Sequence, residues 1–294
     1  QNKYRFKLDG LGSTINVFRK IPSYKNHLIP YVLDRFIYGE KLFVLNPKIE
    51  KLYDSLVNIV VKTRNWNQLT VITDKAYENK IINKEEMFEN KSIALYEIAK
   101  IKMKSDTIQA TQSIEKAINM KKGFSPYIKL YLEILFTFNN INKIQKVLKK
   151  NWNEFPSASL RLSITKVLKD NKISDLDFIK TFISKNINNE ESNKLLIDFA
   201  IHFNKWSTAR EKIKGLIGTN PTKEICLFMS KIELGEFNDI QKSEGWKLRA
   251  NNSDIDNYWV CKITNNTQKD WSALSDSGHF NSLEWRQSKM LSRF

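Results

Sequence analysis

The sequence predicts an all-α fold, a solenoid of antiparallel helix pairs, followed by a small Trp-rich β meander at the C-terminus. Three observations support this prediction. Apolar residues recur every three or four positions over most of residues 50–250, which is the helical period. Only 9 Gly and 6 Pro occur among 294 residues, too few for the many turns of an all-β fold. Short polar turns recur between the apolar runs at a nearly constant interval.

Residues 1–30 form the first segment, which we expect to be an N-terminal lead or a partial repeat. Gly10, Gly12 and Pro22 interrupt it, and its charges are mixed. Such breakers close to a terminus favour loose structure over a packed helix. The chain starts with Gln and contains no run of about 18 apolar residues. We therefore expect it to be a soluble piece of a longer protein.

Residues 31–250 contain the repeat. Six polar turns are each followed by a marker residue, and the markers are spaced by 41, 34, 33, 32 and 31 positions. The markers are Trp66, Thr107, Ile141, Ser174, Trp206 and Phe237. A period near 34 residues with two helices per period is typical of tetratricopeptide (TPR) repeats. An irregular helical bundle is the alternative.

The repeat phase predicts which side chains are buried. With Trp66 at position 17 of a 34-residue unit, Leu56 and Ala76 occupy buried positions, and aligning Trp206 in the same way buries Ala200. Small residues at such positions let two helices approach closely. One helical hairpin cannot bury its own apolar face, so five or six pairs are expected to stack.

The first helix of each pair should line a concave wall, where exposed side chains meet a partner protein. Positions 5, 9, 12 and 13 of the units around Ile141 and Trp206 supply the candidate partner-binding residues, although ordinary solvent-facing roles are the alternative. These candidates are Lys129, Glu133, Phe136, Thr137, Lys194, Asp198, Ile201 and His202.

Residues 251–294 change character, because the helical period stops and Trp becomes frequent. Residues 258–263 alternate with period two, which predicts a strand with Trp259, Cys261 and Ile263 on one face. Residues 269–274 and 282–285 are the second and third predicted strands. A meander of this size is marginal alone, so we expect it to dock on the last helices. Its Trp residues form either a small aromatic core or a binding surface.

The sequence shows no constellation for catalysis, a metal or a cofactor, so we predict that the protein is not an enzyme. It lacks HExxH, GxGxxG, P-loop and GxSxG patterns, and its three His residues have no ligand spacing. Cys226 is predicted to be a core residue. Cys261 has no CxxC partner, because Thr264 stands at the next ligand position. Ser275 to His279 is interpreted as a Gly-containing turn and not as a catalytic triad.

The charge allows two kinds of anionic partner. Lys and Arg number 48 against 32 Asp and Glu, which gives a formal net charge of +16. The lysines are spread along the chain, and no basic tail or RNA-reading motif occurs, so nucleic acid is disfavoured as a partner. An anionic membrane surface stays open, since nearby basic residues favour it by about 1 kcal/mol each.

Three parts of the chain carry a family resemblance. The turn Arg64–Leu69 is one, the runs Ala209–Lys212 and Glu224–Glu233 are the second, and Trp271–Trp285 is the third and most specific, since it is long and aromatic. In these stretches the chain resembles the HemY family, TPR-containing membrane proteins associated with haem biosynthesis in proteobacteria, and most closely its alphaproteobacterial branch. The resemblance covers roughly residues 45–286.

The resemblance implies a function and a location. Members of that family carry upstream transmembrane helices that place the TPR domain on the cytoplasmic side of the bacterial inner membrane, and they are assigned to a late step of haem synthesis. The implied role is a non-catalytic scaffold that binds haem-pathway enzymes or membrane proteins. Direct binding or handling of porphyrin or haem, or a TPR adaptor in envelope assembly, are the alternatives.

Overall fold

The structure is a computed structural model that describes Gly39, Phe43 and residues 50–287, except 174, 219–220 and 254–256. The predicted lead at residues 1–30 lies outside the described residues. The chain divides into two compact units, Gln1–Ile98 and Ala99–Phe294, and each is treated by itself.

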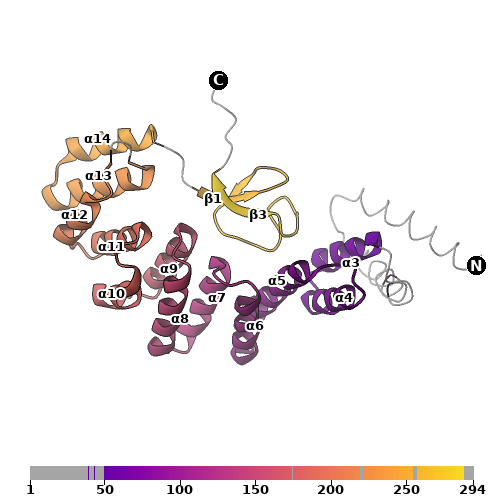
Figure 1. Cartoon of the computed structure of the whole chain (residues 1–294). Helices are drawn as coiled ribbons and strands as arrows, with labels where there is room; N and C mark the ends of the chain where they lie inside the picture. The colour runs from indigo at the N-terminus through magenta and orange to yellow at the C-terminus, as the bar shows by residue number, and fades with distance from the viewer. Residues whose placement is uncertain are drawn as a thin grey trace, which may run out of the picture. The chain divides into compact units, whose positions relative to one another are not determined.

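The described residues form helix after helix and then a small sheet (Figure 1). The elements are α3 (Glu50–Lys62), α4 (Trp66–Glu78), α5 (Lys84–Lys102), α6 (Thr107–Met120), α7 (Ser125–Thr137), α8 (Ile141–Glu154), α9 (Ala158–Asp170), α10 (Leu176–Ile183), a 3-10 turn at Ser184–Asn186, α11 (Glu190–His202), α12 (Trp206–Lys214), α13 (Lys223–Phe237), α14 (Ile240–Asn251), β1 (Asn257–Cys261), β2 (Thr267–Gln268) and β3 (Leu283–Gln287). This order confirms the predicted fold class, a solenoid of helix pairs with a small C-terminal sheet.

The turns inside the helix pairs explain the regular spacing of the sequence. A residue with positive φ stands in five of them: Arg64, Asn139, Lys172, Asn204 and Asn238. This left-handed conformation reverses the chain within a few residues. Side chains such as those of Asn65, Asp106 and Asn140 then accept a backbone N–H at the start of the next helix, as N-caps do.

Four of the six predicted markers are the first residues of second helices, and a fifth, Ser174, lies outside the described residues. Trp66, Thr107, Ile141 and Trp206 begin α4, α6, α8 and α12. The last marker is wrong, because Phe237 ends α13 and α14 begins only at Ile240. The predicted turn at 235–237 is still helical, and Asn238, with a φ of 53°, makes the reversal instead.

In the first unit, α3 and α4 pack through the side chains that the repeat phase predicts to be buried. Leu56, Leu69 and Ala76 are fully or almost fully buried. The Asn90 side-chain amide donates a 3.0 Å hydrogen bond to the hydroxyl of Tyr53, which ties α5 to α3. Stacking of neighbouring hairpins buries one side of each helix in this way, whereas a single hairpin would leave that side exposed.

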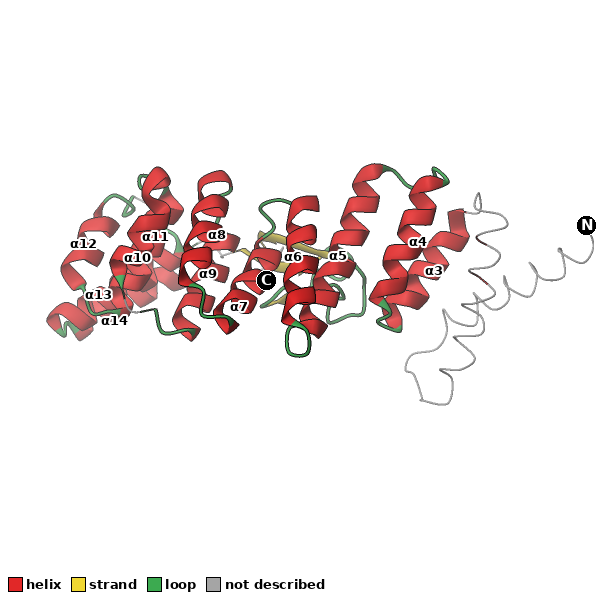
Figure 2. Ribbon diagram, turned by 90° about the horizontal axis from the view of Figure 1, so that it is seen from below, coloured by secondary structure: helices red, strands yellow, loops and turns green. Residues whose placement is uncertain are grey.

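In the second unit, the first helices form one wall. Helix α7 contacts α9, α9 contacts α11, and α11 contacts α13. Figure 2 shows the helices of residues 99–294 as a row, with α6 at one end and α12, α13 and α14 at the other. Ile197, Ala200, Ala209 and Ile232 belong to one buried apolar cluster that joins α11, α12 and α13. Each pair therefore completes the core of its neighbour.

The C-terminal sheet, which we call the meander (residues 257–287), has the strand order β2-β1-β3 with antiparallel pairs. Trp259 lies opposite Gln268 on one side and Trp285 on the other. The predicted second strand at 269–274 is wrong, since β2 is Thr267–Gln268. Ile263 does not share the buried face of Trp259 and Cys261, because it lies in the turn after β1 and is 64% exposed.

The meander docks near the middle of the second unit and not, as expected, on the last helices. Phe124, which precedes α7, packs edge-on against Trp271 and Trp259, with ring centroids 5.2 and 5.9 Å away. Tyr127 adds a further edge contact to Trp271 at 5.9 Å. Trp259 and Trp271 are buried, so for these two residues the aromatic core is confirmed. Figure 1 shows the sheet facing α7 and α9.

Two helical glycines provide a test of this packing. A Cβ at Gly235 in α13 would overlap the indole ring of Trp206, whereas a Cβ at Gly245 in α14 would meet nothing within 4 Å. Gly235→Ala should lower the free energy of unfolding by about 1–3 kcal/mol, since overpacking outweighs helix propensity. Gly245→Ala should raise it by about 0.5–1 kcal/mol. Denaturant unfolding of both variants measures the difference, and equal shifts would contradict the packing of Trp206.

Candidate functional site

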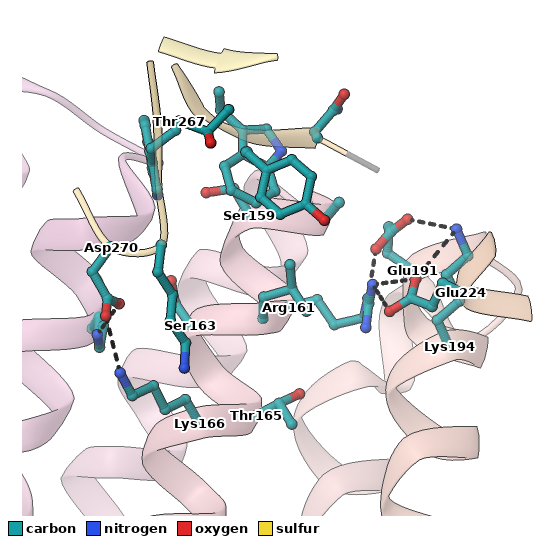
Figure 3. Close-up of a pocket in the computed structure, with 18 of the residues that line it drawn as sticks. Ser159, Arg161, Ser163, Thr165, Lys166, Glu191, Lys194, Glu224, Thr267 and Asp270 are labelled. Carbon is teal, nitrogen blue, oxygen red and sulfur yellow. Dashed lines mark hydrogen bonds and ion pairs between the residues drawn. The ribbon is translucent and has the colours of Figure 1, made fainter. Parts of the chain in front are cut away.

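A groove of about 1010 Å³ lies between the first helices of the second unit and the meander (Figure 3). Helices form one wall and strands form the other. Its lining residues are Lys129, Ala158, Ser159, Arg161, Leu162, Ser163, Thr165, Lys166, Glu191, Lys194, Thr222, Glu224, Asn257, Tyr258, Trp259, Thr267, Gln268, Lys269, Asp270, Trp285 and Gln287.

Helix α9 supplies the centre of the helical wall, because its sequence separates two faces. Leu160, Ile164, Val167 and Leu168 are buried in the solenoid. The groove side carries Ser159, Leu162, Ser163 and Lys166, which are spaced at i, i+3, i+4 and i+7, the spacing of one helix face. The hydroxyl of Ser157 accepts the N–H of Leu160 and so fixes where this helix begins.

Asp270 ties the two walls together. Its carboxylate accepts a 2.8 Å bond from Lys129 Nζ on α7 and a 3.1 Å bond from Lys166 Nζ on α9 (Figure 3). Burial raises the pKa of Asp270, but the hydrogen bonds from the two lysines outweigh burial and lower it. The pKa of Lys166 is raised by the same bond. At neutral pH the meander is therefore held to two first helices by charge as well as by its aromatic contacts.

Arg161 fastens three first helices at one end of the groove. Its side chain is 2% exposed, its Nε lies 2.7 Å from Glu191 on α11, and its Nη2 lies 2.6 Å from Glu224 on α13. Burial lowers the pKa of Arg161, but the two carboxylates outweigh burial and raise it. Lys194 completes the cluster, 3.3 Å from Glu191. Removing one partner of a buried ion pair of this kind lowers the free energy of unfolding by several kcal/mol, so the cluster holds the helices in one register.

The structure brings two of the eight predicted candidates, Lys129 and Lys194, into the groove lining. Glu133 is half-buried beside Lys129, and its burial raises its pKa. Asp198 is paired with Lys169 at 2.9 Å.

The other four predicted candidates lie elsewhere. Phe136 is half-buried and Thr137 exposed at the end of α7. Ile201 packs against the apolar cluster of α11 to α13. His202 is exposed beside Phe203, with ring centroids 5.1 Å apart. Nothing in the structure tests a binding role for any of the eight, so they stay predictions.

Sequence reasoning missed the residues of α9 and of the meander. The same repeat positions applied to the unit around Ser174 would have named Leu162 and Lys166, so that part of the groove had a signal in the sequence. Trp285 belongs to the Trp residues for which the sequence left a binding surface open. Tyr258 and Asp270 had no signal, because their place depends on the chain returning from α14 to α7.

The described residues contain no group of three His, Cys, Asp or Glu side chains arranged to hold a metal ion. Cys261 is buried, and its sulfur lies 3.4 Å from the hydroxyl of Ser282. Thr264 and Ser277 approach within 3.4 Å of each other through their hydroxyls. Among the described helices, each is too short or too polar to cross a bilayer.

Comparisons with known proteins show likeness in structure only. No protein-family model matches the sequence, and no curated protein matches it either. A tetratricopeptide repeat protein from Parabacteroides merdae aligns over 78% of this chain and 90% of its own, with 13% identity and a TM-score of 0.36. YrrB, described as a TPR protein with an unusual peptide-binding site, aligns over 73% and 97%, with 14% identity and a TM-score of 0.31. At these values the likeness does not extend to what the chain binds.

The pairing of Asp270 gives a prediction about pH. The pKa of this carboxyl is lower in the folded chain than in the unfolded chain, so its stabilisation is complete above about pH 4, the unfolded value, and is lost as the pH falls through the folded pKa. Because Asp270 is about half exposed, screening limits the effect to about 1 kcal/mol or less. Amide exchange over residues 257–287, corrected for intrinsic rates, should accelerate below that pH.

Two variants separate this effect from general acid unfolding. Asp270→Asn should accelerate exchange in the meander already at pH 7 and should flatten the pH dependence. Asp276→Asn is the matched control in the same meander, because the Asp276 side chain is exposed. Equal exchange in both variants at pH 7 would contradict the role of Asp270.

Proposed function

We propose that this protein is a non-catalytic scaffold that binds other proteins, and that the groove between the first helices and the meander is its docking surface. The observation that supports this most is the groove itself. It runs along α7, α9, α11 and α13 and has a second wall of strands, so it offers a continuous surface to a partner segment. A lining that mixes apolar, polar and charged side chains suits protein recognition.

The groove is preformed, which favours binding. Arg161 and its carboxylates fix three helices, and Asp270 with its lysines fixes the meander against two of them. Surfaces that are already ordered lose less conformational entropy on association than mobile ones. The volume lies at the upper limit of ordinary small-molecule sites, about 300–1,000 Å³, and the lining comes from seven elements, so an extended protein segment is the better fit.

The finer assignment comes from the sequence resemblance alone. We propose that the scaffold serves a late step of haem biosynthesis at the cytoplasmic face of a bacterial inner membrane, with haem-pathway enzymes or membrane proteins as its partners. The residues that support this are those of Trp271–Trp285, the most specific part of the resemblance to the HemY family. This stretch also supplies Trp271 and Trp285 to the meander.

A pair of surface variants tests the groove. Leu162→Glu places a charge in the groove at a side chain that is 43% exposed, so folding should be preserved. Ile108→Glu makes the same change on α6 at another exposed side chain, outside the groove lining. The measurement is affinity capture from the native cells. The amount of protein that co-purifies with the parent chain should fall at least about tenfold with Leu162→Glu and should stay unchanged with Ile108→Glu. Retention by both variants would contradict a docking role for the groove.

A further inference from the structure

Strand β3 lies at one edge of the meander sheet. The strand order is β2-β1-β3, so β1 is its only strand partner among the described residues. The N–H of Lys262 donates to the carbonyl of Ser282 at 2.7 Å, which makes these two residues a hydrogen-bonded pair. Hydrogen-bonded and non-hydrogen-bonded pairs alternate along an antiparallel ladder. The backbone groups of Glu284 and Arg286 therefore point toward β1, opposite Val260 and Tyr258.

The alternate residues of β3 direct their backbone groups away from the sheet. These residues are Leu283, Trp285 and Gln287. Among the described residues, the only hydrogen-bond partner of these outward groups is Arg286, whose Nη1 lies 3.2 Å from the carbonyl oxygen of Gln287. Gln287 is exposed and Trp285 is half-buried, so the edge is within reach of another chain. A row of open N–H and C=O groups is a template for a further strand.

The side chains of β3 carry opposite charges at alternate positions. Glu284 and Arg286 point to the same side of the sheet, since they are two residues apart. Edge strands often carry charges that keep a second copy away, and a single sign would do so here. Two antiparallel β3 strands centred on Trp285 would instead place Glu284 opposite Arg286 of the second copy, and the reverse. Opposite charges at directly facing positions stabilise a strand pair.

Other registers are disfavoured for one of two reasons. A shift by one position places the outward groups of one strand opposite inward groups of the other, so the ladder cannot form. A shift by two positions places Glu284 opposite Glu284, or Arg286 opposite Arg286, and like charges directly opposite are destabilising. Centring on Trp285 also aligns all five residues of β3. Hydrogen bonding, charge and strand length therefore select the same register.

We propose that two copies of this chain associate through antiparallel pairing of their β3 strands, centred on Trp285, so that the two meanders form one continuous sheet. The contact is self-complementary, as a two-fold dimer requires. A pair of five-residue strands buries less than the roughly 1,200 Å² of a stable interface, so the association should be weak. The proposal does not depend on the scaffold function, because it uses the outer edge of β3 and leaves open what occupies the groove.

Charge reversal combined with sedimentation equilibrium of the full chain tests the dimer, from about 1 μM to about 1 mM. The parent chain should shift from monomer to dimer over this range. Glu284→Arg and Arg286→Glu should each raise the dimer Kd at least about tenfold, because each places like charges opposite one another. An equimolar mixture of the two variants should dimerise like the parent, since every new arginine then faces a glutamate; this also shows that both variants fold. Glu244→Arg reverses an exposed charge on α14 as the control and should change the Kd by less than about twofold.

Disulfide formation tests the register. Non-hydrogen-bonded pairs bring two Cα atoms to about 4.5 Å, a distance that a disulfide can bridge. Under oxidising conditions, a mixture of Glu284→Cys and Arg286→Cys should form a cross-linked dimer, and each variant alone should form at least about fivefold less. The parent chain, whose Cys226 and Cys261 are buried, gives the background.

Three results would overturn the proposal. The first is a parent chain that stays monomeric over the whole concentration range. The second is a dimer that Glu284→Arg and Arg286→Glu weaken no more than Glu244→Arg does. The third is equal cross-linking of the single cysteine variants and of their mixture. The groove is tested separately, because the capture experiment with Leu162→Glu changes a residue of α9 and none of β3.

Discussion

The position of the meander in residues 99–294 depends on an aromatic contact, in which Phe124 packs between the solenoid and the buried side chains of Trp259 and Trp271. Gly123 makes this contact possible. Its φ of +71° turns the chain just before α7, and a Cβ there would overlap the ring of Phe155. The turn presents Phe124 to Trp259 and Trp271, while the ammonium of Lys121 lies 4.4 Å from the centre of the Phe124 ring. Edge-on aromatic pairs of this kind add about 0.5–1.5 kcal/mol each beyond the area that they bury.

This contact converts a repeat wall into a groove with two different sides. Without the meander, α7, α9, α11 and α13 would offer only a row of helices. With it, strands and the loop around Asp270 face Leu162 and Lys166 across a shared cavity. The C-terminal segment thus has two roles, since it buries its own apolar side chains against α7 and supplies aromatic and basic groups to the candidate docking surface. Asp270 adds an ion pair to each of two helices of the opposite wall, through Lys129 and Lys166.

The sequence predicts the helical part well because each repeat follows local rules. Left-handed turns precede Trp66, Ile141 and Trp206, and a capping side chain precedes the first two. These features lie within a few positions of the markers, so a spacing analysis finds them. The sequence predicts the end of α13 too early, because Gly235 resembles a turn residue. The structure gives another reason for a glycine at this position, since Gly235 packs closely against the ring of Trp206. The docking of the meander could not be predicted, because it depends on contacts between residues more than 100 positions apart, such as Lys129 and Asp270. The helical wall of the groove could be predicted from the repeat positions, whereas the strand wall could not, because it depends on these long-range contacts.

The most direct test of this account is zero-length carbodiimide cross-linking of the full chain, which joins a lysine and a carboxylate only when they are already in contact. An amide bond should form between Asp270 and Lys129 or Lys166, whose Nζ atoms lie 2.8 and 3.1 Å from the Asp270 carboxylate, and mass spectrometry of the digested protein should identify it. The product should be absent from Asp270→Asn. A contradictory result would be cross-links from Asp270 to lysines of α14, such as Lys247, and none to Lys129 or Lys166. Such cross-links would place the meander on the last helices.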